Sequence, residues 1–246
     1  MTSTDGAPDE PDLLIRPAHD DDAAPLADLF VAAREAAYPA MPHPVHPPEE
    51  VRRRFREVLG LEQRTAPLPD EREIWVAEAD GVLVGYAVLD PGWLDSLYVR
   101  PDLTGRGIGT ALLDLVKTLR PDGFGLWVFA GNVAAQRFYR RHGLVPVRRT
   151  DGSEDEERAP DGEMLWPGAD PLGAVRARID EVDARLADLL DQRALLTAAA
   201  QHLKRVGGHA GRDPDREAQI VARMAQRAPD LGAEARARIM DTVIAA

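Results

Sequence analysis

The chain has 246 residues, of which 44% are hydrophobic and 29% are charged, and this composition excludes a wholly disordered protein. The absence of cysteine excludes disulfides, thiolate zinc sites and a cysteine nucleophile. Residues 171–246 hold 12 basic and 11 acidic residues, so the net charge of −12 comes from residues 1–170. Neither part of the chain is basic enough to bind nucleic acid. No apolar run reaches the ~18–20 residues of a membrane span, and the acidic start is unlike a signal peptide. We therefore expect a cytoplasmic protein with no nucleic-acid or membrane partner.

The aromatic residues divide the chain into two parts. All five Phe, four Trp and four Tyr lie at or before Trp166, and the remainder is rich in Ala, Leu and Arg. A mixed core with aromatic residues is expected in front, and a helical unit behind. The stretch at residues 167–171, with two prolines and a glycine, is typical of a linker. We expect a disordered tail at residues 1–11, a first domain at 12–167 and a helical domain at 168–246.

The first domain begins with a short strand, a helix, a loop rich in proline and histidine, and a second helix. Three runs rich in Val, Ile, Trp and Tyr follow, separated by turn-forming residues, and they predict an antiparallel meander. A helix, two further strands and an intervening segment complete the domain. In chain order the predicted elements are strand 13–16, helix 20–37, loop 38–48, helix 49–60, strands 73–78, 82–89 and 94–99, helix 111–119, and strands 124–129 and 145–149.

A glycine loop joins the third strand of the meander to the next helix. It reads Thr104-Gly105-Arg106-Gly107-Ile108-Gly109-Thr110. Backbone amides in such a loop, together with the helix dipole, can hold an anionic group such as a phosphate. The spacing G-x-G-x-G matches neither the dinucleotide-binding fingerprint nor the phosphate-binding loop of nucleotide hydrolases. By itself the loop is equally consistent with a turn that binds nothing.

The segment from Asn132 to Leu144 reads N-x-x-A-x-x-F-Y-x-x-x-G-L. Together with the glycine loop and the order of elements, it resembles the GNAT N-acetyltransferase family over residues 13–166. The resemblance implies an α+β fold, in which a mixed, mostly antiparallel twisted sheet is flanked by helices. It also implies acetyl-CoA as co-substrate and an amine, which the sequence does not identify, as acceptor.

The resemblance assigns the pyrophosphate of acetyl-CoA to the glycine loop and the pantetheine arm to the preceding strand, whose amide would polarise the thioester carbonyl. The residue before the first glycine, usually Arg or Gln in the family, is Thr104 here. Arg106 and Arg100 could compensate, or they could be solvated surface charges. Asn132 would hydrogen-bond the arm. The implied cofactor-binding residues are Leu97, Val99, Gly105, Arg106, Gly107, Gly109, Thr110 and Asn132.

Two residues are candidates for acid–base catalysis of acetyl transfer. The resemblance implies that Tyr139 protonates the leaving thiolate, and the alternative is a half-buried core aromatic. Asp95 could accept the amine proton through water, or be a surface turn carboxylate. His43 and His46 are spaced like a metal pair, but flanking prolines prevent a regular helix and we expect no carboxylate to complete the set. We therefore expect no metal at this site. We expect the two histidines either to contact the acceptor or to be loop residues without a ligand.

A long apolar stripe marks the start of the second domain. Residues 172–205 contain no proline, and apolar side chains recur at steps of three and four residues. This pattern predicts one helix about 50 Å long. Only two shorter helices remain to cover it, so we expect a partner chain.

Two cations, Arg193 and Lys204, project into the middle of this stripe, and Arg176 lies at its edge. A buried cation without a counter-ion is strongly disfavoured, so each needs an anion. Asp183 or Glu217 could supply it from within the chain. The cations could equally bind an anionic ligand.

The segment at residues 212–217 reads R-D-P-D-R-E, with Asp213 as N-cap and Pro214 in the first helical position. With Lys204 upstream, it closely resembles the all-helical, AroQ-class chorismate mutases over residues 171–246. The resemblance implies an all-α, three-helix domain that forms an intertwined homodimer and rearranges chorismate to prephenate without a nucleophile or metal.

The resemblance also assigns roles to the cations. Arg193 and Arg216 would hold the substrate carboxylates, Lys204 would donate to the ether oxygen, and Arg176 would reach into the partner's site. Asp213 and Glu217 would contact the hydroxyl and ring region. The implied substrate-binding residues are Arg176, Arg193, Lys204, Asp213, Arg216 and Glu217, and the implied catalytic residues among them are Arg193, Lys204 and Glu217.

One departure from this family concerns the last helix. Family members carry a Gln or Glu there that donates a second hydrogen bond to the ether oxygen, and this chain reads Val243-Ile244-Ala245-Ala246. Loss of one such donor costs on the order of 10²–10³ in rate. Two hypotheses stay open. One is a bifunctional acetyltransferase and mutase; the other is an acetyltransferase whose second domain dimerises or senses chorismate or prephenate.

Overall fold

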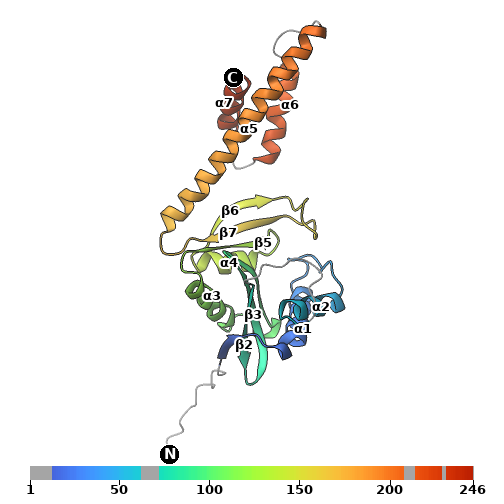
Figure 1. The fold of residues 1–246 in the computed structure, drawn as a ribbon, viewed down its shortest axis with the longest axis vertical. Helices are drawn as coiled ribbons and strands as arrows, with labels where there is room; N and C mark the ends of the chain where they lie inside the picture. The colour runs from blue at the N-terminus through green and yellow to red at the C-terminus, as the bar shows by residue number, and fades with distance from the viewer. Residues whose placement is uncertain (1–12, 62–71, 208–213, 229–230, 246) are drawn as a thin grey trace, which may run out of the picture. The chain divides into compact units, whose positions relative to one another are not determined.

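The computed structural model describes residues 13–61, 72–207, 214–228 and 231–245 (Figure 1). The chain divides into two compact units, Met1–Val175 and Arg176–Ala246. The predicted tail at residues 1–11 lies outside the described residues. Within them, no helix is long and apolar enough to cross a membrane.

The first unit is built on one sheet of strands in the order β1-β2-β3-β4-β5-β7-β6. All neighbouring strands are antiparallel except β4 and β5, which run parallel. The mixed, mostly antiparallel sheet predicted from the sequence is therefore confirmed. The strands are β1 (Leu13–Pro17), β2 (Glu73–Ala79), β3 (Val82–Asp90), β4 (Trp93–Val99), β5 (Phe124–Phe129), β6 (Val145–Thr150) and β7 (Asp161–Trp166).

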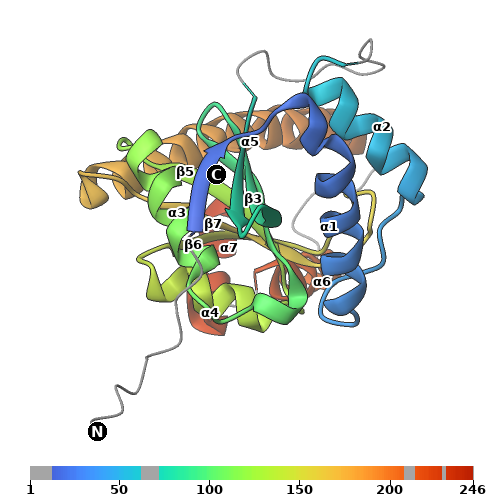
Figure 2. The ribbon, with the colours of Figure 1, turned by 90° about the horizontal axis from the view of Figure 1, so that it is seen from below.

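Helices cover both faces of this sheet, with α1 and α2 on one face and α3 on the other (Figures 1 and 2). Along β3, Tyr86 and Val88 pack with α1 and α2, whereas Ala87 and Leu89 pack with α3. This is the two-residue alternation of a strand that is buried on both faces. The helices are η1 (Asp20–Asp22), α1 (Ala23–Ala36), α2 (Pro48–Val58), η2 (Pro101–Leu103), α3 (Ile108–Leu119) and α4 (Val133–Arg141).

The sequence does not predict β7, which pairs with both β5 and β6. The strand opens with Asp161, Gly162 and Glu163, residues that are depleted in strands. Its identity comes from its position between two other strands, where Glu163 and Met164 are buried. Tertiary pairing overrides local preference here.

The parallel strands β4 and β5 share a single registered pair, Trp93 with Gly125. A Cβ atom on Gly125 would lie 2.8 Å from the Trp93 indole, so the ring packs directly over the glycine. The structure gives no further β4–β5 pair among the described residues. The two strands therefore separate beyond Trp93, and the middle of the sheet opens.

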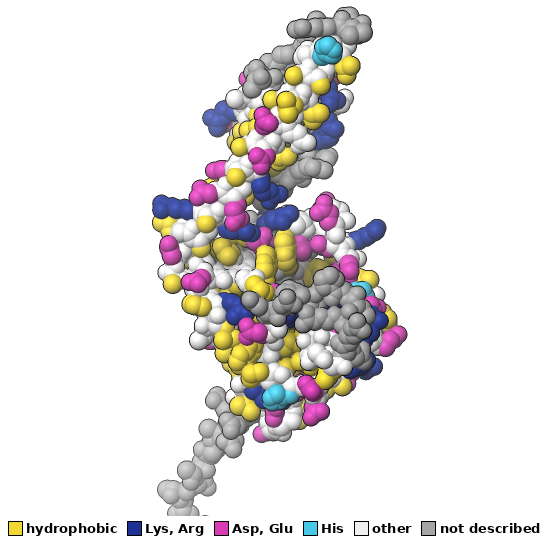
Figure 3. All heavy atoms as spheres, in the orientation of Figure 1, with side chains coloured by type: hydrophobic (Ala, Val, Ile, Leu, Met, Phe, Trp, Pro, Cys, Tyr) yellow, Lys and Arg dark blue, Asp and Glu magenta, His cyan; other side chains and the backbone are white. Residues whose placement is uncertain are grey.

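The second unit is helical, with α5 (Pro171–Gly207), α6 (Pro214–Arg227) and α7 (Ala233–Ala245). The long helix α5 matches the helix predicted for residues 172–205. Its apolar side chains are exposed in the single chain, and Figure 3 shows apolar side chains along this part of the molecule. Leu189 is 60% exposed and Leu203 is 70% exposed.

Candidate active site

A cavity of about 730 Å³ occupies the gap between β4 and β5, and we call it the β4–β5 cavity. Both strands contribute to its lining, as do α1, α4 and the loop between β6 and β7. The lining therefore combines apolar strand residues with a rim of carboxylates. Among the lining residues are Phe30, Arg34, Asp95, Ser96, Leu97, Val99, Trp127, Asn132, Tyr139, Glu154, Glu156 and Glu157.

The structure brings together in this cavity four residues that the family resemblance assigns to acetyl-CoA. Leu97 and Val99 line it from β4, and Asn132 and Tyr139 line it from the start and body of α4. The Asn132 side chain caps α4, where its Oδ1 accepts a hydrogen bond from the Ala135 amide at 3.1 Å. This bond fixes the Asn132 side chain at the cavity wall.

Tyr139 belongs to the main core cluster and also lines the β4–β5 cavity. The residue is 8% exposed, so it is more buried than the half-buried aromatic considered from the sequence. Burial raises the pKa of the phenol above its ordinary value, because the charged phenolate loses solvation. The phenol therefore keeps its proton at neutral pH.

The glycine loop leads into α3, which begins at Ile108. Gly105 has φ +83° and Gly107 has φ +86°, in the left-handed region that favours glycine. A Cβ at either position would meet no atom within 4 Å, so the space above the loop is open. The loop amides next to the N-terminus of a 12-residue helix fit a phosphate-bearing ligand.

Side chains around the glycine loop are engaged elsewhere. Arg100 forms an exposed ion pair with Asp102 at 2.8 Å, and the Thr104 hydroxyl donates to the Pro101 carbonyl. The Thr110 hydroxyl lies 3.1 Å from a ring nitrogen of His142. Arg100 is thus committed to Asp102, and the backbone carries the anion-binding capacity of the loop.

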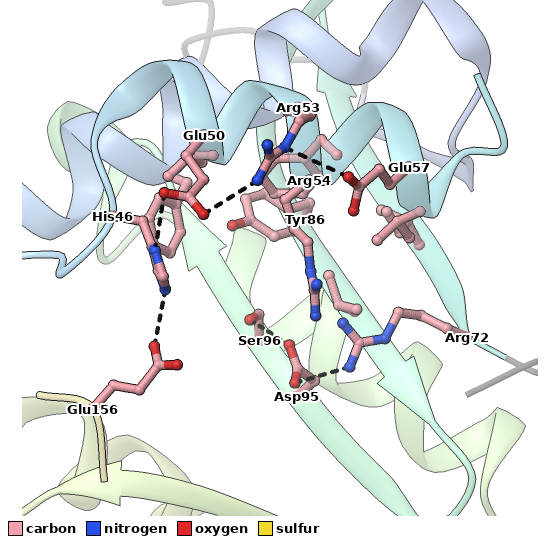
Figure 4. Close-up of a pocket in the computed structure, with 16 residues that line it drawn as sticks. His46, Glu50, Arg53, Arg54, Glu57, Arg72, Tyr86, Asp95, Ser96 and Glu156 are labelled. Carbon is pink, nitrogen blue, oxygen red and sulfur yellow. Dashed lines mark hydrogen bonds and ion pairs between the residues drawn. The ribbon is translucent and has the colours of Figure 1, made fainter. Parts of the chain in front are cut away.

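A second cavity, of about 580 Å³, lies beneath α2, and we call it the α2 cavity (Figure 4). Four residues line both cavities, so the two cavities adjoin at this point: Phe30, Asp95, Ser96 and Glu156. The further lining of the α2 cavity is rich in charged residues, including His46, Glu50, Arg53, Arg54, Glu57 and Arg72.

Asp95 lies within β4, not in a turn as the alternative interpretation of the sequence held. Its Oδ1 lies 3.2 Å from Arg72 Nη2, and its Oδ2 accepts a hydrogen bond from the Ser96 hydroxyl at 2.9 Å. Arg72 in turn is bound by Asp90 at 2.5 Å. Asp95 therefore stands at the boundary of the two cavities as part of an ion-pair network.

His46 connects two elements that are distant in sequence. One ring nitrogen lies 3.2 Å from Glu50 of α2, and the other lies 2.9 Å from Glu156 of the β6–β7 loop. Glu156 is brought to His46 from 110 residues away, a contact that the sequence does not predict. His43 is separate and stacks on Tyr38 with ring centroids 4.2 Å apart.

In the second unit, Arg193 Nη1 donates to the Val243 carbonyl near the end of α7 at 2.6 Å. Among the described residues no ion pair joins Asp183 to Arg193, and the Glu217 side chain lies outside the described residues, so an internal carboxylate stays a prediction. The Val243 carbonyl lies at the negative end of the α7 helix dipole. Arg176 and Arg216 are exposed side chains. Asp213 and the side chains of Lys204 and Glu217 lie outside the described residues.

Comparison with known proteins agrees with this architecture. Residues 30–144 match the sequence profile of the acetyltransferase (GNAT) family, and residues 175–246 match that of chorismate mutase type II. The peptidyl-lysine N-acetyltransferase YjaB of Salmonella typhimurium is 30% identical over 108 residues, which cover 44% of this chain and 74% of that protein. The fold and these matches define a GNAT-family domain joined to a second, helical domain.

Two further relatives extend the comparison. The peptidyl-lysine N-acetyltransferase YiaC of Escherichia coli is 34% identical over 94 residues, and the chain spans 62% of its length and 38% of its own. The solution structure of apo YjaB from Escherichia coli shares the fold, with a TM-score of 0.50 and 21% identity, and covers 64% of this chain and 99% of that chain. The chain belongs to the GNAT acetyltransferase family and carries a chorismate mutase type II domain at its C-terminal end.

The contact of His46 with two carboxylates predicts a pH-dependent link between α2 and the β6–β7 loop. Hydrogen bonding to Glu156, and then to Glu50, raises the pKa of His46 above its ordinary value of about 6.5. The stabilisation is therefore complete below about pH 6.5 and is lost as the pH rises through the raised pKa. We expect an NMR titration of the His46 ring to show this raised pKa. Glu156→Gln should lower the pKa of His46, because it removes the carboxylate that contributes most to the shift.

Glu154→Gln is the matched control, because it removes a carboxylate from the same loop without a bond to His46. It should leave the His46 titration nearly unchanged. A His46 pKa at or below its ordinary value of about 6.5 would contradict the predicted link.

Proposed function

We propose that the protein is bifunctional, with an N-acetyltransferase in the first unit and a chorismate mutase in the second. For the first unit, the carrying observation is the opening of the sheet at the single Trp93–Gly125 pair, with Tyr139 lining the gap. Acetyl-CoA, implied by the GNAT fold, fits the open glycine loop and the unpaired part of β4. An amine, which peptidyl-lysine exemplifies in the relatives, is the acceptor class.

The chain's own groups hold the thioester and manage protons. The amides of Gly105, Gly107, Gly109 and Thr110 bind the pyrophosphate, with Arg106 beside them, and the β4 backbone at Leu97 and Val99 binds the arm and polarises the carbonyl. Asn132, held by its capping bond, lines the path of the arm.

Proton transfer then balances the reaction. The amine nitrogen forms a bond to the thioester carbon, the carbon–sulfur bond breaks, and the sulfur leaves as a thiolate. Tyr139 gives its proton to that thiolate, and burial ensures that the phenol still carries the proton at neutral pH. Asp95, at the boundary of the cavities, accepts the amine proton through water. Return of a proton through solvent from Asp95 to the Tyr139 phenolate restores both groups.

Replacement of Tyr139 by Phe tests the acid. We expect Tyr139→Phe to lower kcat by about 10²–10⁴-fold while the KM for acetyl-CoA changes little, because only the transferable proton is removed. Thiol release from acetyl-CoA in the presence of an amine measures both constants. Tyr98→Phe is the control, since it removes a hydroxyl from the same cavity without removing the proposed acid. Equal losses in the two variants would argue against proton donation by Tyr139.

For the second unit, the apolar face of α5 supports a homodimer. Leu189, Leu196 and Leu203 are each at least 60% exposed, and a helix of 37 residues presents this stripe along most of its length. Monomeric proteins rarely leave such a patch in water. We infer that a second copy of the chain covers it.

Charge placed on this stripe should separate the copies. We expect the protein to sediment as a dimer, and Leu189→Lys to shift it toward the monomer without loss of helical circular dichroism. Asp188→Lys, at the neighbouring position, is the matched control and should stay dimeric. A monomeric parent protein, or equal behaviour of the two variants, would contradict the proposed dimer.

The mutase proposal assigns Arg193 and Arg216 to substrate carboxylates, Lys204 to the ether oxygen, and Asp213 and Glu217 to the hydroxyl and ring region. Arg176 would enter the site of the second copy. The family match over residues 175–246 supports it. Catalysis would consist of holding the reactive conformer and stabilising charge on the ether oxygen.

Loss of chorismate absorbance tests the mutase directly. We expect turnover in the parent protein and a loss of at least about 10²-fold in Arg193→Ala, because a preorganised cation is removed. Arg178→Ala, which removes an exposed α5 arginine that is paired with Glu181, should retain activity.

Absence of turnover in the parent would instead favour the second candidate function, a dimerising or chorismate-sensing domain. The Arg193–Val243 hydrogen bond favours this candidate, because it engages the guanidinium within the chain. Chorismate binding by calorimetry would then separate sensing from dimerisation alone.

A further inference from the structure

The α2 cavity contains a cation without a described counter-ion. Arg54 lines this cavity from α2, and among the residues that the structure describes no carboxylate forms an ion pair with it. Figure 4 shows its side chain extending from α2 into the cavity, on the side where Arg72 and Asp95 also lie. An arginine in this position is available to bind an anion.

The other cations of the lining are already paired. Arg53 contacts Glu50 at 3.2 Å and Glu57 at 3.5 Å. Arg72, whose side chain is 14% exposed, binds Asp90 through two of its nitrogens at 2.6 and 2.5 Å and also contacts Asp95. Among the described cations of this lining, the charge of Arg54 therefore remains without a counter-ion. An arginine guanidinium is well suited to bind a carboxylate through two parallel hydrogen bonds.

The charged residues differ in which of the two cavities they line. Asp95 and Glu156 line both cavities, so they lie where an acceptor must approach the β4–β5 cavity. Arg54 and Arg72 line the α2 cavity only. The cation that lacks a described counter-ion, Arg54, therefore lies in the α2 cavity, whose own carboxylates Glu50 and Glu57 are engaged with His46 and Arg53. Asp95 and Glu156 also face the β4–β5 cavity, where the cation Arg34 is paired with Glu157. A ligand that spans this arrangement carries an ammonium at one end and an anion at the other.

We propose that the acceptor is a small amine that also bears a carboxylate, bound with its carboxylate at Arg54 and its amino group near Asp95 and Glu156. The inference rests on the proposed acetyltransferase function and specifies its substrate class. The enclosed volume of about 580 Å³ is within the range of small-molecule sites. The carboxylate supplies the missing counter-ion, and the acidic boundary of the cavities attracts the ammonium form before it loses its proton for attack.

The test compares pairs of amines that differ only in the anionic group. The probes are the ω-amino acids with one to five methylene groups and the primary carboxamide of each, with thiol release from acetyl-CoA as the readout. We expect at least one acid to exceed its amide in kcat/KM by about 10- to 100-fold, as the loss of a charge-assisted hydrogen bond predicts. In Arg54→Gln this ratio should fall toward one, chiefly through KM.

Arg52→Gln is the matched control. Arg52 is on the same helix, does not line the cavity and pairs with Asp28 of α1 at 2.7 Å, so the acid-to-amide ratio should be preserved. Calorimetry of the preferred acid in the presence of coenzyme A gives a second readout that does not depend on turnover. It should show weaker binding to Arg54→Gln than to Arg52→Gln.

Several results would overturn the proposal and also locate the error. If the carboxamides or a lysine-containing peptide react as well as the best acid, the acetyltransferase function stands but the acceptor carboxylate is wrong. An acid preference that persists in Arg54→Gln would place the anion elsewhere. No transfer to any of these amines by a protein that binds coenzyme A would count against the proposed function as well.

Discussion

The first unit depends on one constraint, which is that two neighbouring parallel strands meet at a single point. Trp93 packs over Gly125, and the close approach is possible because glycine has no side chain. Beyond this contact the strands separate, and β4 has polar backbone groups that face a cavity instead of a strand. Buried backbone groups need hydrogen-bond partners, so an extended polar ligand is a natural occupant of the gap. The site is thus a consequence of incomplete pairing within the sheet.

The charged groups around the gap have a second organising role. The β6–β7 loop supplies Glu156, which joins His46 of the α1–α2 loop, while Arg72 joins Asp95 to Asp90. These pairs come from segments far apart in the sequence, and together they surround the passage between the two cavities. The charges of these paired groups partly neutralise one another. Arg54 has no described counter-ion, and the carboxylate of the proposed acceptor would neutralise it.

The helical unit follows a different principle. Its long helix presents an apolar stripe that a single chain leaves in water, whereas Arg193 is turned to the carbonyl end of α7. The exposed stripe and the engaged cation are separate features of this unit. The proposed dimer and the proposed ligand site address these two features separately.

Much of the fold follows from local sequence signals. Alternating apolar residues predict β2, β3 and β4, and the uninterrupted apolar stripe predicts α5. The helix predicted after the glycine loop is α3, which begins at Ile108 and not at residue 111. These elements are predictable because each is encoded by residues close together in the chain. The strand β7 is not, since its pairing with β5 and β6 outweighs its polar start.

The site divides in the same way. Motif residues such as Gly107 and Tyr139 can be read from the sequence, because a short segment fixes their backbone conformation and spacing. The sequence by itself thus determined the family, the two domains and the residues of their motifs. Only the tertiary structure decided that Glu156 meets His46, that Arg72 holds Asp95 and that Arg193 meets Val243. Such contacts depend on how separate elements pack, and no local pattern of residues specifies that packing.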